Sequence, residues 1–235
     1  PSHMGGAYAV TGQLENVGYA AKLYNATNGL PTSDANTILA TSDGYIWIGG
    51  YSGLIRYDGT NFERLDSSDG LANAKTLYED HKGRLWIGSN DNGVVVLDHG
   101  EQTQFTYKDG LPSSTIRSIT EGTDGRIFLG TTSGIAYVDD EMTIHTLNEA
   151  QLEHEYIIKL CSDSDGTIYG NTRNGDAFCI EGTKMTAFYH GEDLGIGNIT
   201  TIYADPKTPG AVYLGTDSST IFFGSFHDNL ERLRR

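Results

Sequence analysis

The stretch DGLANAKTLYEDHKGRLWIGSNDNGVVVLDHGEQTQF, residues 69–105, contains the pattern that decides the fold. An apolar pair, Leu77 and Tyr78, precedes a turn that ends at Gly83, and the apolar run 85–87 follows this turn. A polar loop then leads through Gly93 into a second apolar run, 94–97. Short apolar runs separated by glycine-containing turns are typical of strands joined by hairpins. The stretch therefore predicts a small antiparallel sheet.

The same pattern occurs five times along the chain. Its turn glycine recurs at Gly44, Gly83, Gly125, Gly166 and Gly210. An aromatic residue follows each of these glycines by three positions: Trp47, Trp86, Phe128, Tyr169 and Tyr213. A repeat of about forty residues is characteristic of propellers, solenoids or arrays. We predict an all-β chain that forms a β-propeller of about five four-stranded antiparallel blades, spanning residues 28–66, 69–108, 109–148, 149–190 and 192–235.

Some copies of the repeat have features that predict local differences between the blades. The outer strand of copy two is expected near residues 105–107. Copy four is expected to be the least regular, because Gly170 replaces an aliphatic residue and Asp176 falls where other copies have Leu, Val or Ile. The acidic segment 148–156 is expected to form one helical turn. Copy five should have its own outer strand at 230–233, since residues 229–233 (NLERL) resemble residues 61–65 (NFERL).

A further strand is expected at residues 19–24, which is surplus to the five blades. In a closed propeller such a strand commonly completes the last blade, whose other three strands come from the far end of the chain. Those three strands are absent here, because copy five is expected to have its own outer strand. We therefore infer that the chain is a segment of a larger propeller. A five-bladed ring with an extra strand and closure by a second copy of the chain are the alternatives. An open propeller exposes sheet faces and edges, which allows a homodimer through the cut edges.

Composition excludes several classes of partner. The formal net charge of −15 argues against nucleic acid and against anionic lipid. No apolar run of about 18 residues is present, so no membrane contact is expected from this segment. Residues 1–6 resemble a vector remnant, and residues 7–18 form a lead-in. Cys161 and Cys179 are expected on the first and third strands of one blade, about 10 Å apart, as free buried thiols.

The repeats resemble a known family. The sequences Asp/Asn-Gly-Leu-Pro, the run from Asp80 to Gly88 and the run from Gly53 to Gly59 resemble the two-component regulator propeller repeat. This resemblance is close in copies one to three and partial in copies four and five. It implies a bacterial ligand-sensing segment in the periplasm or at the cell surface, part of a membrane-anchored receptor of the histidine kinase or diguanylate cyclase type. Some relatives detect oligosaccharides, so the implied ligand is a small molecule such as a glycan, or a partner domain.

The expected site lies on the face where the loops between blades meet the loops between the second and third strands. We predict that two rings of residues bind the ligand there: Asn36, Lys75 and Arg117, continued by Ile158 and Thr200, and then Tyr51, Asn90, Asp91, Thr132, Arg173, Asn174 and Asp217. Lys75, Arg117 and Arg173 fit an anionic or sugar-acid ligand, and Tyr51 fits stacking on a sugar ring. The other interpretation is that these are solvated loop residues with local ion pairs.

Other chemistry is not indicated. The repeated aromatic residues are expected in the core between blades. The run Asp163 to Gly166 resembles the start of a calcium loop but lacks the remaining ligands, and the histidines lack metal-ligand spacing. No catalytic residue, metal or cofactor is predicted. Two alternatives stay open: an interaction scaffold without a small ligand, and a carbohydrate-active lyase or hydrolase using Asp34, Asp91 and Asp217.

Overall fold

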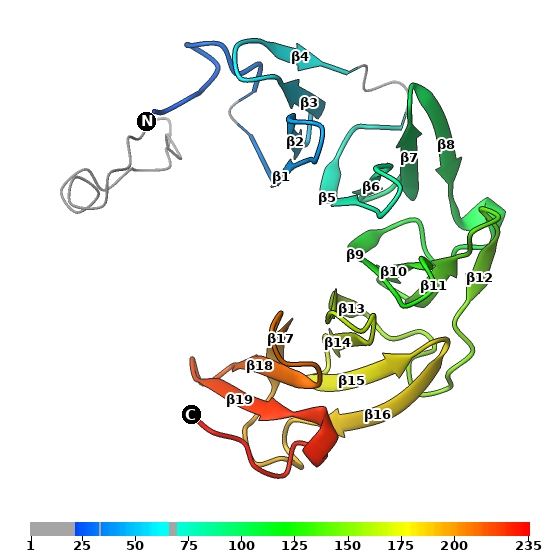
Figure 1. Ribbon diagram of the computed structural model, residues 1–235, viewed down its shortest axis with the longest axis vertical. Coiled ribbons are helices and arrows are strands. Elements are labelled where there is room, and N and C mark those ends of the chain that lie inside the picture. Colours follow the sequence, from blue (N-terminus) through cyan, green and yellow to red (C-terminus); the bar gives the residue numbers. More distant parts are fainter. Residues whose placement is uncertain (1–21, 33, 66–69) are drawn as a thin grey trace.

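The computed structural model describes residues 22–32, 34–65 and 70–235, which form five antiparallel sheets arranged around an arc (Figure 1). In every sheet consecutive strands pair, so the strand order follows the chain. The first strand of each sheet lies on the inner side of the arc, and the ring is open between the first and last sheets (Figure 1). The architecture confirms the predicted all-β propeller, and its sheets form an open arc (Figure 1).

Four blades have four strands, and the fifth has three. Blade one contains β1 (Thr37–Ala40), β2 (Ile46–Gly50), β3 (Gly53–Tyr57) and β4 (Phe62–Arg64). Blade two contains β5 (Ala74–Glu79), β6 (Leu85–Ser89), β7 (Val94–Asp98) and β8 (Glu101–Phe105). Blade three contains β9 (Ile116–Glu121), β10 (Ile127–Thr131), β11 (Gly134–Val138) and β12 (Ile144–Thr146).

The second half of the chain continues the series. Blade four contains β13 (Ile157–Ser162), β14 (Ile168–Thr172), β15 (Asp176–Glu181) and β16 (Lys184–His190). Blade five contains β17 (Ile199–Ala204), β18 (Ala211–Thr216) and β19 (Ile221–Ser225). Two short 3-10 helices are η3 (Tyr107–Asp109) and η4 (Phe226–Asp228). No helix in the described part of the chain is long and apolar enough to cross a membrane.

The hydrophobic core lies between neighbouring sheets, as one cluster at each of the four junctions. The repeated aromatic residue of the second strand belongs to these clusters in the first four blades, as predicted: Trp47, Trp86, Phe128 and Tyr169. In blade five the equivalent Tyr213 is 41% exposed, because no further blade packs against it. Burial of this aromatic therefore depends on the next blade in the ring.

Two strand predictions were wrong. The outer strand of blade two is Glu101–Phe105, because Thr106 caps η3 in a reciprocal capping box with Asp109 and ends the strand there. Blade five has no outer strand at 230–233. The left-handed residues Asn229 and Leu230 turn the chain after η4, and a single bridge joins Phe223 to Arg234.

Blade four, expected to be the least regular, has four complete strands, but it is the one described blade with two register shifts, one between β13 and β14 and one between β15 and β16. Segment 148–156 makes one turn, in which the Glu153 N–H donates to the Glu149 carbonyl at 3.1 Å. Cys161 on β13 and Cys179 on β15 are free, as predicted. Burial raises the pKa of both thiols to about 11, so neither is a thiolate near neutral pH.

Residues 1–18 and most of the strand expected at 19–24 lie outside the described residues. Residues 22–24 form no strand, and the ring of Tyr24 packs edge-on against Phe62 at 5.3 Å.

Candidate functional site

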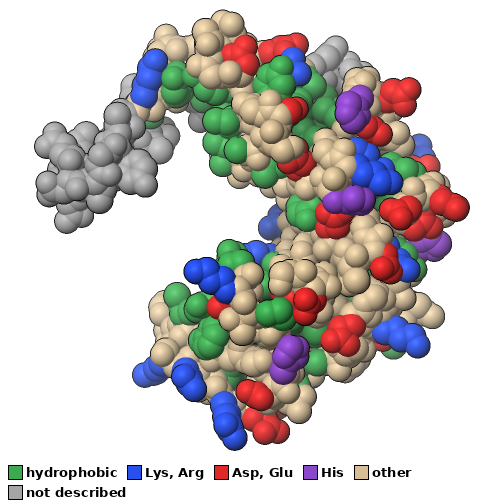
Figure 2. Space-filling view, viewed as in Figure 1, with side chains coloured by type: hydrophobic (Ala, Val, Ile, Leu, Met, Phe, Trp, Pro, Cys, Tyr) green, Lys and Arg blue, Asp and Glu red, His purple; other side chains and the backbone are tan. Residues whose placement is uncertain are grey.

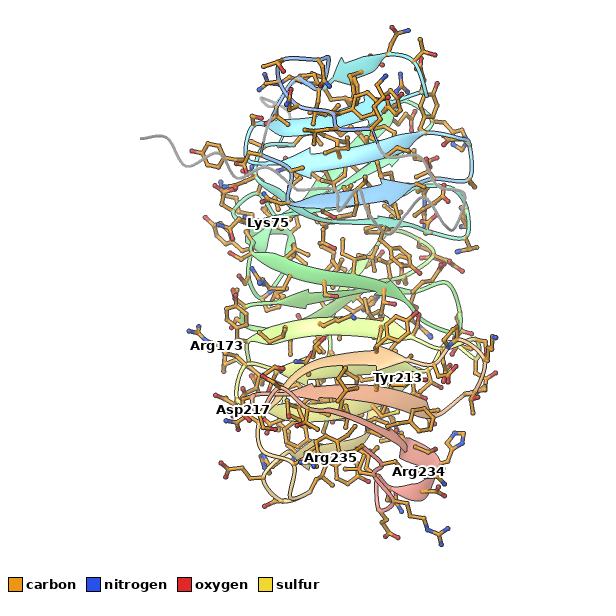
Figure 3. The ribbon with its side chains drawn as sticks, turned by 90° about the vertical axis from the view of Figure 1, so that its left-hand side faces the viewer. Lys75, Arg173, Tyr213, Asp217, Arg234 and Arg235 are labelled. Atoms are coloured by element: carbon orange, nitrogen blue, oxygen red, sulfur yellow. The ribbon has the colours of Figure 1, made fainter. Side chains whose placement is uncertain are left out.

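The propeller has two faces around its axis. We call the loop face the side formed by the segments 70–73, 112–115, 153–156 and 192–198 with the loops 90–93, 132–133, 173–175 and 217–220. We call the turn face the opposite side, formed by hairpin turns such as 41–45, 80–84, 98–100 and 122–126. Lys75, Arg173 and Asp217, from both predicted rings, project along one edge of the molecule, which is the loop face (Figure 3).

A β-bulge at the start of the inner strand aims the first ring. The strand register shifts by one residue at this point in four blades, and the unpaired residues are Lys75, Arg117, Ile158 and Thr200. A bulge bends its strand and redirects one side chain, and bulges are frequent beside binding sites. In these four blades, the residues of the first predicted ring therefore occupy the same β-bulge.

A repeated backbone hydrogen bond brings the second ring beside the first. In each of four blades, the loop between the second and third strands donates an N–H to the residue two positions before the bulge. The four bonds are Asn90 to Asn73 at 3.2 Å, Thr132 to Thr115 at 3.3 Å, Arg173 to Tyr156 at 2.9 Å and Asp217 to Asn198 at 3.0 Å. Each blade thus presents one residue from each ring as neighbours.

The strongest constellation of the loop face is formed by two arginines and one tyrosine. The guanidinium carbon of Arg117 lies 5.6 Å from the ring centre of Tyr156, and that of Arg173 lies 5.2 Å from the same ring. Both distances are within the range of cation–π contacts, which leave the guanidinium N–H groups free to bind. Beside them, the Asn174 amide donates to the Glu155 carboxylate at 2.8 Å. The site thus holds two oriented guanidinium groups from adjacent blades.

These cations lack the acidic partners found elsewhere. Arg84 pairs with Asp80 and Arg126 pairs with Asp124, each at 2.6 Å. Within residues 22–32, 34–65 and 70–235, the side chains of Lys75, Arg117 and Arg173 form neither an ion pair nor a hydrogen bond. Among the described residues, these three cations therefore lack the local ion pairs that the alternative interpretation required. Three cations without an acidic partner among the described residues therefore lie on one face of a chain whose formal net charge is −15.

The other predicted residues are not joined to the two arginines. Asn36 and Tyr51 belong to blade one, where the Tyr51 ring is 69% exposed. The Thr132 hydroxyl bonds the Ser113 hydroxyl at 2.8 Å, and the Asp217 carboxylate accepts from the Asn198 amide at 3.1 Å. Asn90 and Asp91 are exposed in the loop of blade two.

Sequence reasoning missed Tyr156, the residue between the two arginines. The signal was present in the alignment of the repeats, because the position two before the bulge holds Asn73, Thr115, Tyr156 and Asn198. The single aromatic residue in this column, next to the loop face, distinguishes blade four from the other three blades.

Blade four also contains a buried acidic group near this face. Asp176 accepts hydrogen bonds from the Thr172 hydroxyl at 3.0 Å and pairs with His190 at 2.6 Å. The hydrogen bond to Asp176 raises the pKa of His190 above its ordinary value. This pairing explains how blade four accommodates Asp176 where other copies have an aliphatic residue.

Asp163 and the acidic residues Asp34, Asp91 and Asp217 are the positions where the sequence left metal or acid–base chemistry open. No group of three or more metal-binding side chains occurs within the described ranges. Asp163, at the start of the calcium-like run, accepts the Tyr169 hydroxyl at 2.7 Å and three backbone N–H groups, so its oxygens have structural partners. Asp34, Asp91 and Asp217 come from blades one, two and five, and no hydrogen bond joins any two of them in the described structure.

The repeated sheets and their bulged inner strands define the chain as a stretch of β-propeller. Three segments, 29–52, 70–91 and 110–133, match the family described as the two component regulator propeller. The chain therefore contains two-component regulator propeller repeats, as the sequence resemblance indicated. Comparison with curated proteins gives no match.

Solved structures share the fold at low sequence identity. The extracellular domain of BT3049 from B. thetaiotaomicron, assigned as a hybrid two component system, aligns with a TM-score of 0.67 at 20% identity over 89% of this chain. The extracellular domain of BT4673 from B. thetaiotaomicron, assigned as a one component system, gives 0.65 at 17% identity over 88%. Virginiamycin B lyase from Staphylococcus aureus gives 0.64 at 15% identity over 82% of this chain and 70% of the lyase. The chain spans only 30% and 29% of the two B. thetaiotaomicron domains.

Proposed function

We propose that the chain is a ligand-sensing segment of a bacterial signal-transduction receptor, located outside the cytoplasm, and that its loop face binds a small anionic molecule such as an acidic glycan. Two observations support the receptor role: the matched repeat family, and a fold shared with extracellular domains assigned to two component and one component systems. The output domain would be a histidine kinase or a diguanylate cyclase on the same parent protein.

The observation that carries the proposal is the pair of unpaired arginines around Tyr156. Guanidinium groups bind carboxylates and sulfates through parallel N–H donors, and stacking on an aromatic ring fixes their direction in advance. Lys75 adds a third cation on the same face, on blade two. A ligand that contacts Arg117 and Arg173 would link blades three and four, so binding would change the packing between blades. The proposed role is binding, without catalysis.

The test is titration calorimetry at low salt with acidic saccharides that carry carboxylate or sulfate groups. Arg117→Gln and Arg173→Gln should each raise the Kd by about tenfold or more, the effect of losing one charge-assisted hydrogen bond. Binding should weaken as salt is added, because exposed charges are screened.

The matched control is Arg126→Gln, which changes the same residue type in blade three but on the turn face, where Arg126 pairs with Asp124. This variant should bind like the unmodified protein. An equal loss of affinity in Arg126→Gln and Arg117→Gln, or no binding of any acidic saccharide, would contradict the proposal.

A further inference from the structure

A cavity of about 340 Å³ lies between blades one and two and is bordered by residues of the turn face. Its apolar part is formed by Trp47, Leu65, Leu85 and Leu97. Charged side chains line it as well: Asp43, Arg56 and Glu79. The turn face is opposite to the loop face, so this cavity is separate from the arginine site. In Figure 2, which views the molecule from the side opposite to the loop face, acidic and histidine side chains are spread along the arc.

The cavity exists because blade two provides no residue to fill it. At the next junction, Met142 from the turn of blade three packs into the cluster around Trp86, which is 0% exposed. At the junction of blades four and five, the ring of Phe226 lies 5.1 Å from that of Tyr169. The corresponding turn of blade two is His99-Gly100, and no apolar side chain of this turn joins the cluster around Trp47.

Arg56 supplies hydrogen-bond donors to the cavity. Its guanidinium lies over the ring of Tyr45 at 4.4 Å and pairs with Glu63 through Nη2. Nε and Nη1 have no hydrogen-bond partner among the residues that the structure describes. Arg56 is therefore held in place on two sides and keeps free donors beside Trp47.

Acceptors come from the two carboxylates. Glu79 accepts the backbone N–H and the hydroxyl of Ser42, each at 3.0 Å, and Asp43 accepts the Thr41 hydroxyl at 2.6 Å. A carboxylate has about four acceptor positions, so both groups can accept further hydrogen bonds. Both are also fixed by these contacts, which lowers the entropy lost on binding.

The mixture of donors and acceptors distinguishes this cavity from the loop face. An anion would be repelled by Asp43 and Glu79, and a cation would compete with Arg56, which already covers Tyr45. Hydroxyl groups both donate and accept, and a pyranose ring has an apolar face that packs on an indole. The volume lies at the lower end of the range of about 300–1,000 Å³ for small-molecule sites. We propose that the cavity is a second binding site, for a neutral monosaccharide or disaccharide.

The test is a fluorescence titration of the whole chain with glucose, maltose and cellobiose. The chain has two tryptophans, and Trp86 is fully buried, so a change in emission reports Trp47. At least one saccharide should give a saturable change. Arg56→Gln removes the free donors, and Leu97→Phe fills the cavity but keeps every polar group. Each variant should raise the Kd by about tenfold or more.

Arg173→Gln, on the other face, should leave the binding of neutral saccharides unchanged, so the two sites are tested separately. Thermal unfolding of Arg56→Gln and Leu97→Phe establishes that both variants remain folded. No saturable signal with any of the three saccharides, or an unchanged Kd in either folded cavity variant, would overturn the assignment. If the unmodified protein binds a neutral saccharide but no acidic saccharide, only the loop-face proposal is contradicted.

Discussion

At the residue scale, the buried aromatic residue of each of the first four blades depends on the residue six positions before it. Where the aromatic has an N–H or O–H group, that earlier residue accepts its hydrogen bond. Trp86 Nε1 donates to the Asp80 carboxylate at 2.8 Å. The same relation joins Trp47 to the Thr41 hydroxyl at 3.1 Å and Tyr169 to the Asp163 carboxylate at 2.7 Å, whereas Phe128, which has no polar atom, is preceded by Gly122. A buried N–H or O–H without a partner is costly, so the two positions vary together.

Asp80→Ala should destabilise the protein strongly. The Asp80 side chain is 0% exposed and accepts from Trp86 and from Nε of Arg84, which lies at 2.6 Å. Removing one partner of a buried ion pair costs about 3–5 kcal/mol. Chemical denaturation of the variant and the unmodified protein measures this difference. Asp124→Ala, at an exposed ion pair of the next blade, should cost less than about 1 kcal/mol.

The contribution of Asp80 should depend on pH in the acid range. Burial works to raise the pKa of Asp80, but hydrogen bonds from Trp86 and Arg84 outweigh it, and the pKa is lowered overall. A carboxyl with a lowered folded-state pKa stabilises the protein above its unfolded-state pKa, about 3.9, and this stabilisation is lost as the pH falls through the folded-state value. The stability difference between the protein and Asp80→Ala should therefore shrink below about pH 4. A difference that stays constant down to pH 2 would contradict this account.

At the element scale, blade four keeps its complete second and third strands because a large side chain on β15 fills the space left by a glycine on β14. Gly170 on β14 pairs with Phe178 on β15, where blade two pairs Ile87 with Val95. A Cβ added at Gly170 would lie 2.3 Å from Cζ of Phe178, so the phenylalanine ring occupies the space of the missing aliphatic side chain. Gly170, which stands where other copies have an aliphatic residue, is therefore complemented by the large side chain of Phe178.

Gly170→Ile alone should destabilise the protein by about 1–3 kcal/mol through overpacking, and Phe178→Val alone by about 3 kcal/mol through a cavity. The double variant reproduces the pair of blade two, so most of the stability should return. A double-mutant cycle by chemical denaturation measures the coupling. Combining Gly170→Ile with Val95→Ala, which lies in another blade, should give additive losses. Additivity of Gly170→Ile with Phe178→Val would show that the two residues do not compensate.

The fold could be predicted from the sequence where it depends on local patterns, and less well where it depends on contacts between strands. The turn glycines and the aromatic residue three positions later located the first three strands of every blade, because both follow from local turn geometry and alternation. The outer strands were less predictable, since their ends depend on single caps such as Thr106 and on left-handed residues such as Asn229. The compensation of Gly170 by Phe178 was missed because it depends on a contact between strands.

For the candidate site, the sequence predicted the position of the ring residues but not the contacts between them. The offset from the strand placed Lys75 and Arg117 correctly in one ring, because the bulge recurs at the same position of the repeat. The role of Tyr156 could not be predicted, because it depends on two arginines that are 56 residues apart in sequence, 117 and 173, meeting at one ring.

At the scale of the whole molecule, the two ends of the arc expose opposite sides of one repeated interface. Ile38 on blade one is 69% exposed, whereas its equivalents at the other junctions are buried: Leu77, Ile119, Leu160 and Ile202. At the other end, Tyr213 and Ile221 are 41% and 66% exposed. Inside the molecule, such surfaces pack against each other at every junction. The two ends are therefore complementary to one another, and each is an apolar surface of the kind that promotes association.

We predict that isolated chains associate head to tail, with blade five of one copy against blade one of the next. Light scattering should show a mass that rises with concentration above the 25.5 kDa of one chain. In a head-to-tail contact both surfaces are used, so Ile38→Ser alone and Tyr213→Ser alone should each abolish association. Tyr107→Ser, at a 64% exposed tyrosine of η3 away from both ends, should not.

Mixing the two variants distinguishes this arrangement from a symmetric dimer. The Ile38→Ser chain keeps an intact blade-five end, and the Tyr213→Ser chain keeps an intact blade-one end, so an equimolar mixture should recover one contact and form dimers. In a symmetric dimer through one end, only one of the two variants would be monomeric, and mixing would add no new contact. A chain that stays at 25.5 kDa at all concentrations would refute self-association altogether, and the exposed ends would then need a different partner.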